Sequence, residues 1–497
     1  MPSQAVLLGI DLGTSGVKAV LLSESGDTLA LASRECPIET PKPGFAEQHP
    51  DSWWQATVEV IREALDRAAI NPSRIAGISF SGQMHGTVVL GRDLRPLRPA
   101  IIWADQRSAP QVSRIRAQLG IPRMLELTAN VLNPGFMGAT LAWLAEEEPD
   151  TLRLARLVIL PKDYLRLRLT GQVASDVSDA SSTAVFDTAR RCWSEEMLTA
   201  VGAPLALMPE VLESTALAGG LTPEAAQATG LVPDTPVVAG GGDQPVAALG
   251  NGVIEPGLLL LTVGTGGQVF APLDSPAFDP QARVHTFCHC LPGRWHLLGA
   301  TLCAGLSLRW LRDLLRAARP QLDYFQLEQL AAQAPPGCEG LLFCPYLIGE
   351  RTPHLDPDLR GAFLGLSLHH GLPHLVRAVL EGVAFSLRDA LEVLREMGVN
   401  AQSAIVSGGG GRSPLWRQIL ADVLALELTV LEGEEQAALG AAMLAGIGAG
   451  VFADASDACR RVVKPAGVIT PSANTDLYQR QYPRFRACHP ALKYAQQ

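Results

Sequence analysis

Two stretches of the chain repeat one pattern of strand, glycine turn and strand. The first runs from Val6 to Leu22 around Gly13-Thr14-Ser15-Gly16, and the second runs from Leu258 to Phe270 around Gly264-Thr265-Gly266-Gly267. Because glycine permits a positive φ, we expect these turns to point successive backbone N–H groups into one concavity. Such a nest, with a hydroxyl beside it, binds anionic oxygens. The repeat predicts a duplicated chain that holds a polyphosphate between its halves.

Length and composition favour a two-domain α/β protein. At 497 residues the chain exceeds what one hydrophobic core usually supports, so we expect two domains, residues 1–245 and 246–497. Hydrophobic residues make up 47% and charged residues 18%, which is typical of a packed protein and not of a disordered one. Strand patterns alternate with helical patterns in both halves, which indicates an α/β fold.

Residue periodicity predicts individual elements. The expected strands are 6–10, 75–80, 154–160, 236–239 and 404–406. The expected helices are 51–65, 307–315 and one that starts at Pro414 with Ser413 as its N-cap. The longest uncharged run, 437–453, is rich in small residues and short for a bilayer, so we interpret it as a buried helix.

The charge balance and the N-terminus exclude several classes of protein. A net charge of −10 and the lack of a basic stripe argue against binding to nucleic acid. Met1-Pro2-Ser3-Gln4 shows no basic region followed by an apolar stretch, so no secretory signal is visible. The nine cysteines are scattered, and Cys288-His289-Cys290 lacks the paired spacing of a zinc site. We therefore expect a cytoplasmic protein with free thiols and no membrane partner.

Asp11 stands at the end of the first strand, beside the first nest. A carboxylate next to phosphate groups is repelled unless a cation lies between them, and Mg²⁺, which takes oxygen ligands, is the natural cation. The corresponding residue of the second copy is Thr262. The alternative interpretation is an aspartate that caps its own turn. A P-loop is excluded because the sequence has no Gly-Lys dipeptide.

Asp243 follows a strand and the triplet Gly240-Gly241-Gly242. The glycines lack side chains, so we expect a ligand to approach the backbone closely there. A carboxylate in this position can accept the proton of a substrate hydroxyl that attacks phosphorus. The alternative is a turn aspartate at a domain junction, and the triplet alone does not decide between the two.

Other polar groups follow strand ends. His85 could hydrogen-bond a hydroxyl while Met84 packs on a carbon skeleton, although a lone histidine is more often structural. Trp103 offers a flat apolar wall and Asp105 an acceptor, and a surface Asp105–Arg107 pair is the alternative. The glycine run 408–411 could admit an adenine ring or a ribose, or could serve only as the loop before a helix.

These motifs together resemble the FGGY carbohydrate kinases, and within them the xylulokinase subfamily. The likeness extends over nearly the whole chain. The segments that carry it are 9–18, 81–86 (Ser-Gly-Gln-Met-His-Gly), 161–167 (Pro-Lys-Asp-Tyr-Leu-Arg-Leu), 240–243, 346–354, 361–366 and 377–382. The first is common to many actin-like ATPases, whereas the Met-His pair and the Lys-Asp-Tyr stretch are more specific to the subfamily.

The resemblance implies two actin-like (ribonuclease H-like) domains that flank a deep cleft and close on ATP and a sugar. It implies ATP-dependent phosphorylation of D-xylulose to D-xylulose 5-phosphate, with Asp243 as proton acceptor and Asp11 acting through Mg-ATP. A homodimer is a family-level expectation. The residues it implies for the sugar are Met84, His85, Trp103, Asp105, Asp243 and Gln244. Those it implies for ATP are Gly13, Thr14, Ser15, Gly264, Thr265, Gly266, Gly408, Gly409 and Gly410.

The chain departs from the expected family pattern at several positions, which keeps other substrates open. Gln244 stands where asparagine is frequent, and Ala104 and Gln106 stand where asparagine and glycine often occur. Gly266 replaces a serine, and Thr140 replaces a common lysine. The alternatives are a kinase of another polyol (ribulose, a deoxypentulose or glycerol) and a non-catalytic, actin-like sugar sensor. Retention of both Asp11 and Asp243 disfavours the sensor.

Overall fold

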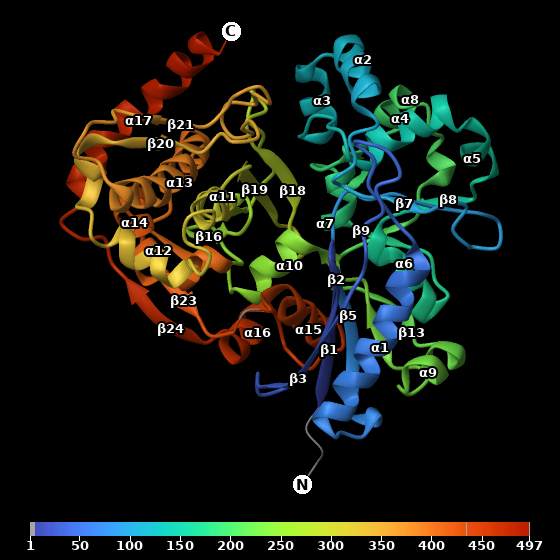
Figure 1. Cartoon of the computed structure of the whole chain (residues 1–497). Helices are drawn as coiled ribbons and strands as arrows, with labels where there is room; N and C mark the ends of the chain where they lie inside the picture. Colours follow the sequence, from blue (N-terminus) through green and yellow to red (C-terminus); the bar gives the residue numbers. More distant parts are fainter. Residues whose placement is uncertain (1–4, 434, 497) are drawn as a thin grey trace.

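The computed structural model describes residues 5–433 and 435–496, which form two lobes, each built on a seven-stranded sheet (Figure 1). The first sheet has the order β13 (Leu217–Gly220), β14 (Pro236–Val238), β5 (Ile75–Gly82), β1 (Val6–Gly13), β2 (Gly16–Ser23) and β3 (Thr28–Glu35), and β15 (Gly241–Gly242) also pairs with β5. The second has the order β18 (His285–Cys288), β19 (Trp295–Thr301), β17 (Gly267–Leu273), β16 (Leu258–Val263), β22 (Ser403–Ser407), β23 (Glu427–Leu431) and β24 (Pro465–Ile469).

The two sheets share one topology. In the first, β1 is antiparallel to β2 and parallel to β5, and β5 is parallel to β14, which is antiparallel to β13. In the second, β16 is antiparallel to β17 and parallel to β22, and β22 is parallel to β23, which is antiparallel to β24. The match confirms the α/β fold and the duplication predicted from the repeated hairpin.

Helices from both halves of the sequence cover the first sheet. Helix α1 (Pro50–Ala68) packs on β2 and β3, while α15 (Gln436–Gly448) packs on β1, β5 and α10 (Asp243–Gly250). In Figure 1 the red α15 lies beside the blue strands of the first lobe. The expected domain boundary at 245 falls inside α10, and the boundary stays a prediction.

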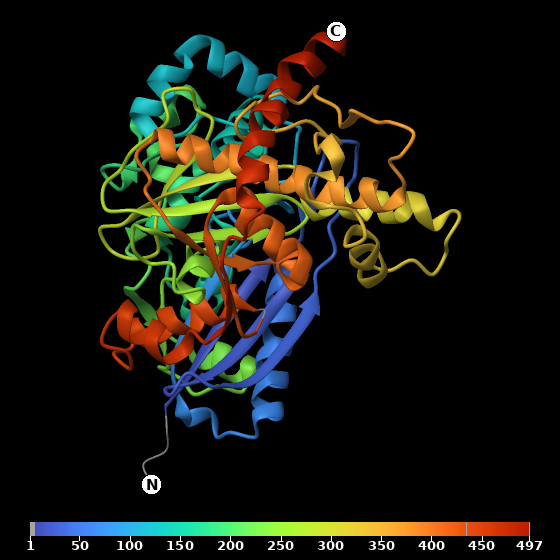
Figure 2. The same ribbon diagram turned by 90° about the vertical axis from the view of Figure 1, so that its left-hand side faces the viewer.

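The long helix α13 (Leu372–Glu396) packs on β17, β19 and β20 (Leu342–Cys344) in the second lobe. Helix α14 (Pro414–Leu424) lies against α13, and α17 (Thr475–Ala495) packs on both helices. Figure 2 shows α17 ending at the C-terminus, at the top of the molecule. The apolar faces of these elements form one continuous buried core.

Shorter elements complete the chain. The other strands are β4 (Glu47–Gln48), β6 (Val88–Leu90), β7 (Ala100–Ile101), β8 (Leu157–Ile159), β9 (Ser175–Asp176), β10 (Phe186–Asp187), β11 (Cys192–Trp193), β12 (Val211–Leu212) and β21 (Ala362–Leu364). The other helices are α2 (Ala109–Leu119), α3 (Ile121–Thr128), α4 (Met137–Glu147), α5 (Pro149–Leu154), α6 (Pro161–Thr170), α7 (Val177–Ala180), α8 (Glu195–Ala200), α9 (Pro223–Thr229), α11 (Gly305–Arg316), α12 (Tyr324–Ala331) and α16 (Ala455–Val462).

Most of the predicted elements are confirmed, including the Ser413 N-cap, whose side chain accepts a hydrogen bond from Trp416 N. The predicted strand 154–160 is too long, because Leu154 ends α5 and only Leu157–Ile159 pairs with β6. The run 437–453 does contain a buried helix, but α15 ends at Gly448. Among the residues that the structure describes, no helix has the length and apolarity needed to cross a bilayer.

The hairpin turns differ from the prediction in their backbone. Gly13, Gly16, Gly264 and Gly266 all lack the expected positive φ. Two of these glycines are needed for close approach instead: a Cβ on Gly16 would lie 2.2 Å from Arg34 O, and one on Gly266 would lie 2.6 Å from Thr301 O. A Cβ on Gly13 or Gly264 would meet no atom closer than 3.5 Å, so neither of these glycines is required by close approach.

Candidate active site

Asp11 and Asp243 lie at the same edge of the first sheet, at the ends of the two strands that flank β5. Asp11 on β1 and Gly241 on β15 both pair with Ser81, on opposite sides of β5. Because adjacent strands lie about 4.8 Å apart, β1 and β15 are separated by about 10 Å. Asp243 is the first residue of α10, directly after β15. The sheet therefore brings both predicted acidic residues to one edge.

Burial, and for Asp243 also the charge of Asp11, favours the protonated forms of these two carboxyl groups. Desolvation raises the pKa of Asp11 to about 6, against the lowering influence of the nearby Ser81 hydroxyl. Desolvation, and next the charge of Asp11, raise the pKa of Asp243 to about 7, while hydrogen bonds from the Gln244 side chain and backbone lower it. A carboxylate with a pKa near 7 is suited to accept a proton at neutral pH.

Asp11 also carries the feature that fits a divalent cation. Its Oδ1 atom is buried and has no hydrogen-bond partner among the described residues. A buried anionic oxygen without a partner is costly unless a proton or a cation neutralises it. Mg²⁺ commonly takes one or two carboxylates together with waters and substrate phosphates, so a single protein carboxylate oxygen suffices for this donor set.

The glycine triplet before Asp243 is buried, and a Cβ on any of the three would clash with protein; the approach of a ligand to this backbone stays a prediction. A Cβ on Gly240, which has φ +76°, would lie 2.6 Å from Phe80 O. A Cβ on Gly241 would lie 2.6 Å from Ser178 Oγ, and one on Gly242 would lie 2.8 Å from Met84 Cγ. The glycines are required because β5 and its neighbours come this close, and Met84 lies beside the residue that precedes Asp243.

A fully buried polar network, which sequence reasoning missed, supports this turn. Gly242 N donates to Ser178 Oγ (3.1 Å), which in turn donates to Asp176 Oδ2 (2.5 Å). Lys162 Nζ lies 2.6 Å from Asp176 Oδ1 and 2.7 Å from Asp163 Oδ1. Lysine is rarely fully buried unless it is paired, and Lys162 is one of only five lysines in the chain. The sequence signal that could have revealed this buried lysine was its place in the Pro-Lys-Asp-Tyr motif.

His85 is held as a neutral ring with a free acceptor. Its Nδ1 lies 2.7 Å from the Ser182 carbonyl oxygen, so Nδ1 carries the proton and Nε2 is the acceptor. Desolvation lowers the pKa of His85 to about 4, so the ring is uncharged at neutral pH. The ring stacks on Phe136 with a centroid distance of 4.0 Å. Its φ of +73° is unusual for a residue with a side chain and marks a constrained position.

Trp103 and Asp105 play different parts. Trp103 is 43% exposed, and its predicted contact with a sugar stays a prediction. Asp105 is only 1% exposed and forms an ion pair with Arg107 (2.8 Å). The alternative interpretation, an Asp105–Arg107 pair on the surface, is wrong, because both partners are buried. The predicted contact of Asp105 with a sugar stays a prediction. Phe136 ties this region to His85, because Gly135 packs directly on Trp103 O.

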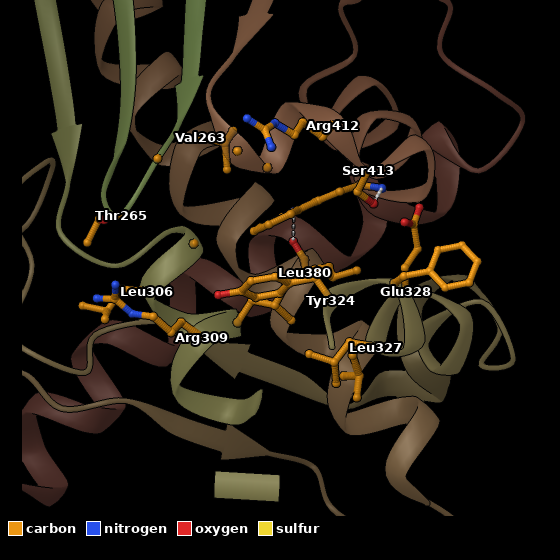
Figure 3. Close-up of a pocket in the computed structure, with 18 residues that line it drawn as sticks. Val263, Thr265, Leu306, Arg309, Tyr324, Leu327, Glu328, Leu380, Arg412 and Ser413 are labelled. Atoms are coloured by element: carbon orange, nitrogen blue, oxygen red, sulfur yellow. Dashed lines mark hydrogen bonds between the residues drawn. The ribbon is translucent and has the colours of Figure 1, made fainter. Parts of the chain in front are cut away.

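The second hairpin and the glycine run line one cavity of about 550 Å³ (Figure 3). Gly264 and Thr265 come from the hairpin, and Gly409 and Gly410 come from the loop after β22. Nothing lies within 4 Å of a Cβ built on Gly409, whereas one on Gly410 would lie 2.4 Å from Val263. The other residues that line the cavity include Arg309, Tyr324, Phe325, Glu328, Arg412, Ser413 and Trp416. The structure thus brings together two of the three predicted nucleotide segments.

Thr14 and Ser15, from the first hairpin, are not among the residues that line this cavity. They belong to the first lobe, next to Asp11, whereas the cavity belongs to the second. The predicted site therefore has two parts: a carboxylate edge on one lobe and a cavity on the other.

Comparison with known proteins gives the family. Residues 6–250 match the N-terminal domain of the FGGY family of carbohydrate kinases, and residues 259–449 match the C-terminal domain. The chain is 42% identical to the xylulose kinase of Escherichia coli (strain K12), over 89% of this chain and 90% of that protein. It is 36% identical to the xylulose kinase of Bacillus subtilis (strain 168), over 98% of each chain.

A crystal structure titled a "xyloylose kinase" from Brucella ovis has the same fold. Its TM-score is 0.92 at 37% identity, and the alignment covers 99% of this chain and 100% of that one. Both halves of the chain match, and the matches account for the two-lobed topology described above. The chain therefore belongs to the FGGY family of carbohydrate kinases.

Proposed function

We propose that this protein phosphorylates D-xylulose to D-xylulose 5-phosphate with ATP. The observation that carries the proposal is the pair Asp11 and Asp243 at one sheet edge, with the pKa of Asp243 raised to about 7. The substrate is taken from the xylulose kinases to which the chain is similar. The Met84-His85 pair, which the resemblance assigns to the sugar, lies next to that edge.

In the proposed mechanism Asp243 is the general base. Its carboxylate accepts the proton of the sugar hydroxyl as the hydroxyl oxygen attacks the terminal phosphorus of ATP. The bond between this phosphorus and the oxygen that bridges it to ADP breaks, and ADP leaves. His85 Nε2 accepts a hydrogen bond from another hydroxyl, while Met84 and Trp103 contact the carbon skeleton. The Gln244 amide keeps Asp243 oriented. Exclusion of water as the lobes close makes the sugar hydroxyl the preferred nucleophile.

Asp11 would hold Mg²⁺ through its unpartnered Oδ1 atom. The cation would supply positive charge that offsets repulsion between the carboxylates and the nucleotide phosphates. The cavity of the second lobe would take the adenosine, with Gly409 leaving room for it and Tyr324 offering an aromatic face. Thr14 and Thr265, one from each hairpin, would meet the phosphates.

Other features of the protein remain proposals that rest on the resemblance alone. We propose a cytoplasmic homodimer whose sugar-binding domain ends near residue 245. Light scattering at micromolar concentration tests the dimer, for which twice the chain mass of 52.8 kDa is expected.

Two other functions compete with this proposal. Gln244, Ala104 and Gln106 belong to the segments that the resemblance assigns to the sugar and depart from the family pattern, which favours testing other pentuloses and polyols. A sugar sensor would bind nucleotide without turnover. An ADP-release assay with D-xylulose, D-ribulose, 1-deoxy-D-xylulose and glycerol separates the three possibilities. Fastest turnover with D-xylulose supports the proposal. Faster turnover with another of these compounds would make that compound the substrate. If none of them is turned over, the protein is better described as a sugar sensor.

The same assay tests the base. Asp243→Ala should lower kcat by about 10²-fold or more, since a positioned base contributes 10²- to 10⁴-fold. Asp150→Ala, on the exposed end of α5, is the matched control and should keep full turnover. Near-normal turnover of Asp243→Ala would refute the assignment of Asp243 as the base.

A further inference from the structure

Trp103 makes a hydrogen bond that its expected role as an apolar wall does not require. The indole Nε1 donates to Thr14 Oγ1 at 2.8 Å. Thr14 lies in the first hairpin turn, between β1 and β2, and Trp103 follows β7. The bond thus joins the loop expected to touch the sugar to the turn expected to touch the nucleotide phosphates. Both residues belong to the first lobe, so the bond does not depend on lobe closure.

The bond fixes the role of the Thr14 hydroxyl. An indole N–H can only donate, so Thr14 Oγ1 must accept, and its own O–H points away from the indole. The backbone of the same residue is also held, because Gln48 Nε2 donates to Thr14 O at 2.9 Å. Gln48 is buried, and its Oε1 accepts from Gln83 Nε2 at 2.9 Å. Gln83 directly precedes Met84-His85, so a second chain of bonds leads to the same region.

The loop that carries Trp103 is rigidly anchored by Asp105. The Asp105 carboxylate accepts from Ala46 N at 2.7 Å and from Arg107 N at 2.9 Å, besides its ion pair with the Arg107 guanidinium. This accounts for the burial of Asp105. Trp103, in contrast, is 43% exposed, and its indole nitrogen is bonded to Thr14 Oγ1. A ligand that lies against the ring would restrict the indole and with it the bond to Thr14.

We propose that Trp103 is a positioning residue that couples the two substrates. A sugar packed against the indole stabilises the Trp103–Thr14 bond, and the hydroxyl of Thr14 is thereby oriented to donate to a nucleotide phosphate. By linkage, each substrate then raises the affinity for the other by the same factor. Asp105 acts indirectly, by holding in place the loop that carries Trp103. The inference rests on the proposed function, since it assigns a sugar and a nucleotide to these two surfaces.

The test is the Trp103→Phe variant, which keeps an aromatic wall and removes the N–H. Calorimetry measures the Kd of adenylyl imidodiphosphate with Mg²⁺, without and with saturating D-xylulose; the ratio of the two values is the coupling factor. We expect a factor above one for the unaltered protein and a factor about two- to tenfold lower for Trp103→Phe, the range set by loss of one hydrogen bond. The Kd of D-xylulose alone should change less than twofold. Trp54→Phe, on α1 with its ring under Arg168, is the control and should keep the full factor.

A double-mutant cycle tells direct coupling from a general loss of structure. Thr14→Val should lower the factor as Trp103→Phe does, and the double variant should lose no more than either alone. An unchanged factor in Trp103→Phe, or additive losses in the double variant, would overturn the inference; if Trp103→Phe fails to fold, Thr14→Val alone decides it. The proposed function is contradicted separately, if the unaltered protein does not phosphorylate any sugar. If the unaltered protein is active but its coupling factor is one, only the inference about Trp103 is contradicted.

Discussion

At the scale of single residues, Asp11 and Asp243 are held in an environment that favours their protonated forms. Burial raises the pKa of Asp11 to about 6 and that of Asp243 to about 7, above the usual 3.8. A carboxyl group whose pKa is higher in the folded chain than in the unfolded chain binds protons more tightly when folded. Its stabilising contribution is fully present below about pH 4 and is lost as the pH rises through 6 to 7.

Asp243→Asn should therefore stabilise the protein when no metal is present. In buffer with a chelator, we expect a gain in the free energy of unfolding that is near zero at pH 4, grows up to about pH 7 and is constant above it. At pH 8 it should reach on the order of a few kcal/mol, since each pKa unit corresponds to about 1.4 kcal/mol. Denaturant unfolding at pH 4, 6 and 8 measures it. Asp150→Asn, an exposed control, should show no such trend.

A gain that does not depend on pH, or a loss at pH 8, would show that the carboxylate at position 243 is not desolvated in the way described. Either outcome would also weaken the case for a base with a pKa near neutrality.

Individual site residues could be predicted where a polar side chain follows a strand. Asp11, His85 and Asp243 were singled out this way, because strand ends and glycine turns are visible in the sequence, and their roles stay predictions. The burial of Lys162 and Asp105 was not predicted, because a charged pair close in sequence, such as Asp105 with Arg107 or Lys162 with Asp163, reads equally well as a surface pair. The raised pKa values likewise depend on which strands lie side by side, which a linear pattern does not reveal.

At the scale of elements, contacts between backbones decide how α10, α15 and β1 pack. A Cβ on Gly440 of α15 would lie 2.0 Å from Val246 O of α10, and one on Gly9 of β1 would lie 2.1 Å from Ala438 O. Backbone atoms cannot move aside as a flexible side chain can. The small residues of α15 are therefore needed to bring this helix against the sheet that carries Asp11.

Gly440→Ala should destabilise the protein by at least about 2 kcal/mol, because overpacking against backbone forces α10 and α15 apart. Gly467→Ala is the matched control: β24 is an edge strand, and a Cβ there meets nothing within 4 Å. Thermal unfolding followed by circular dichroism measures both. Equal melting temperatures for the two variants would contradict the packing described.

Elements were largely predictable, but their partners were not. The duplicated hairpin predicted two sheets of one topology, because turn spacing and apolar runs are local signals. The return of α15 to the first lobe was not predicted, because an all-apolar helix indicates burial without indicating where. The turns were recognised for the wrong backbone reason, since glycine serves there for close approach and not for a positive φ.

At the scale of the whole molecule, the acidic edge lies on the first lobe and the cavity on the second. Neither lobe alone holds what phosphoryl transfer requires. Substrates that bridge the lobes would complete the site, and binding would favour the arrangement in which the two hairpins approach. The account therefore depends on one nucleotide touching both hairpins at once.

A crystal structure with adenylyl imidodiphosphate and Mg²⁺ tests this requirement most directly. The account predicts the adenine in the cavity beside Gly409 and Tyr324, the phosphates between Thr14 and Thr265, and the cation beside Asp11. Density for the nucleotide that is confined to one lobe, or that lies away from both turns, would contradict it.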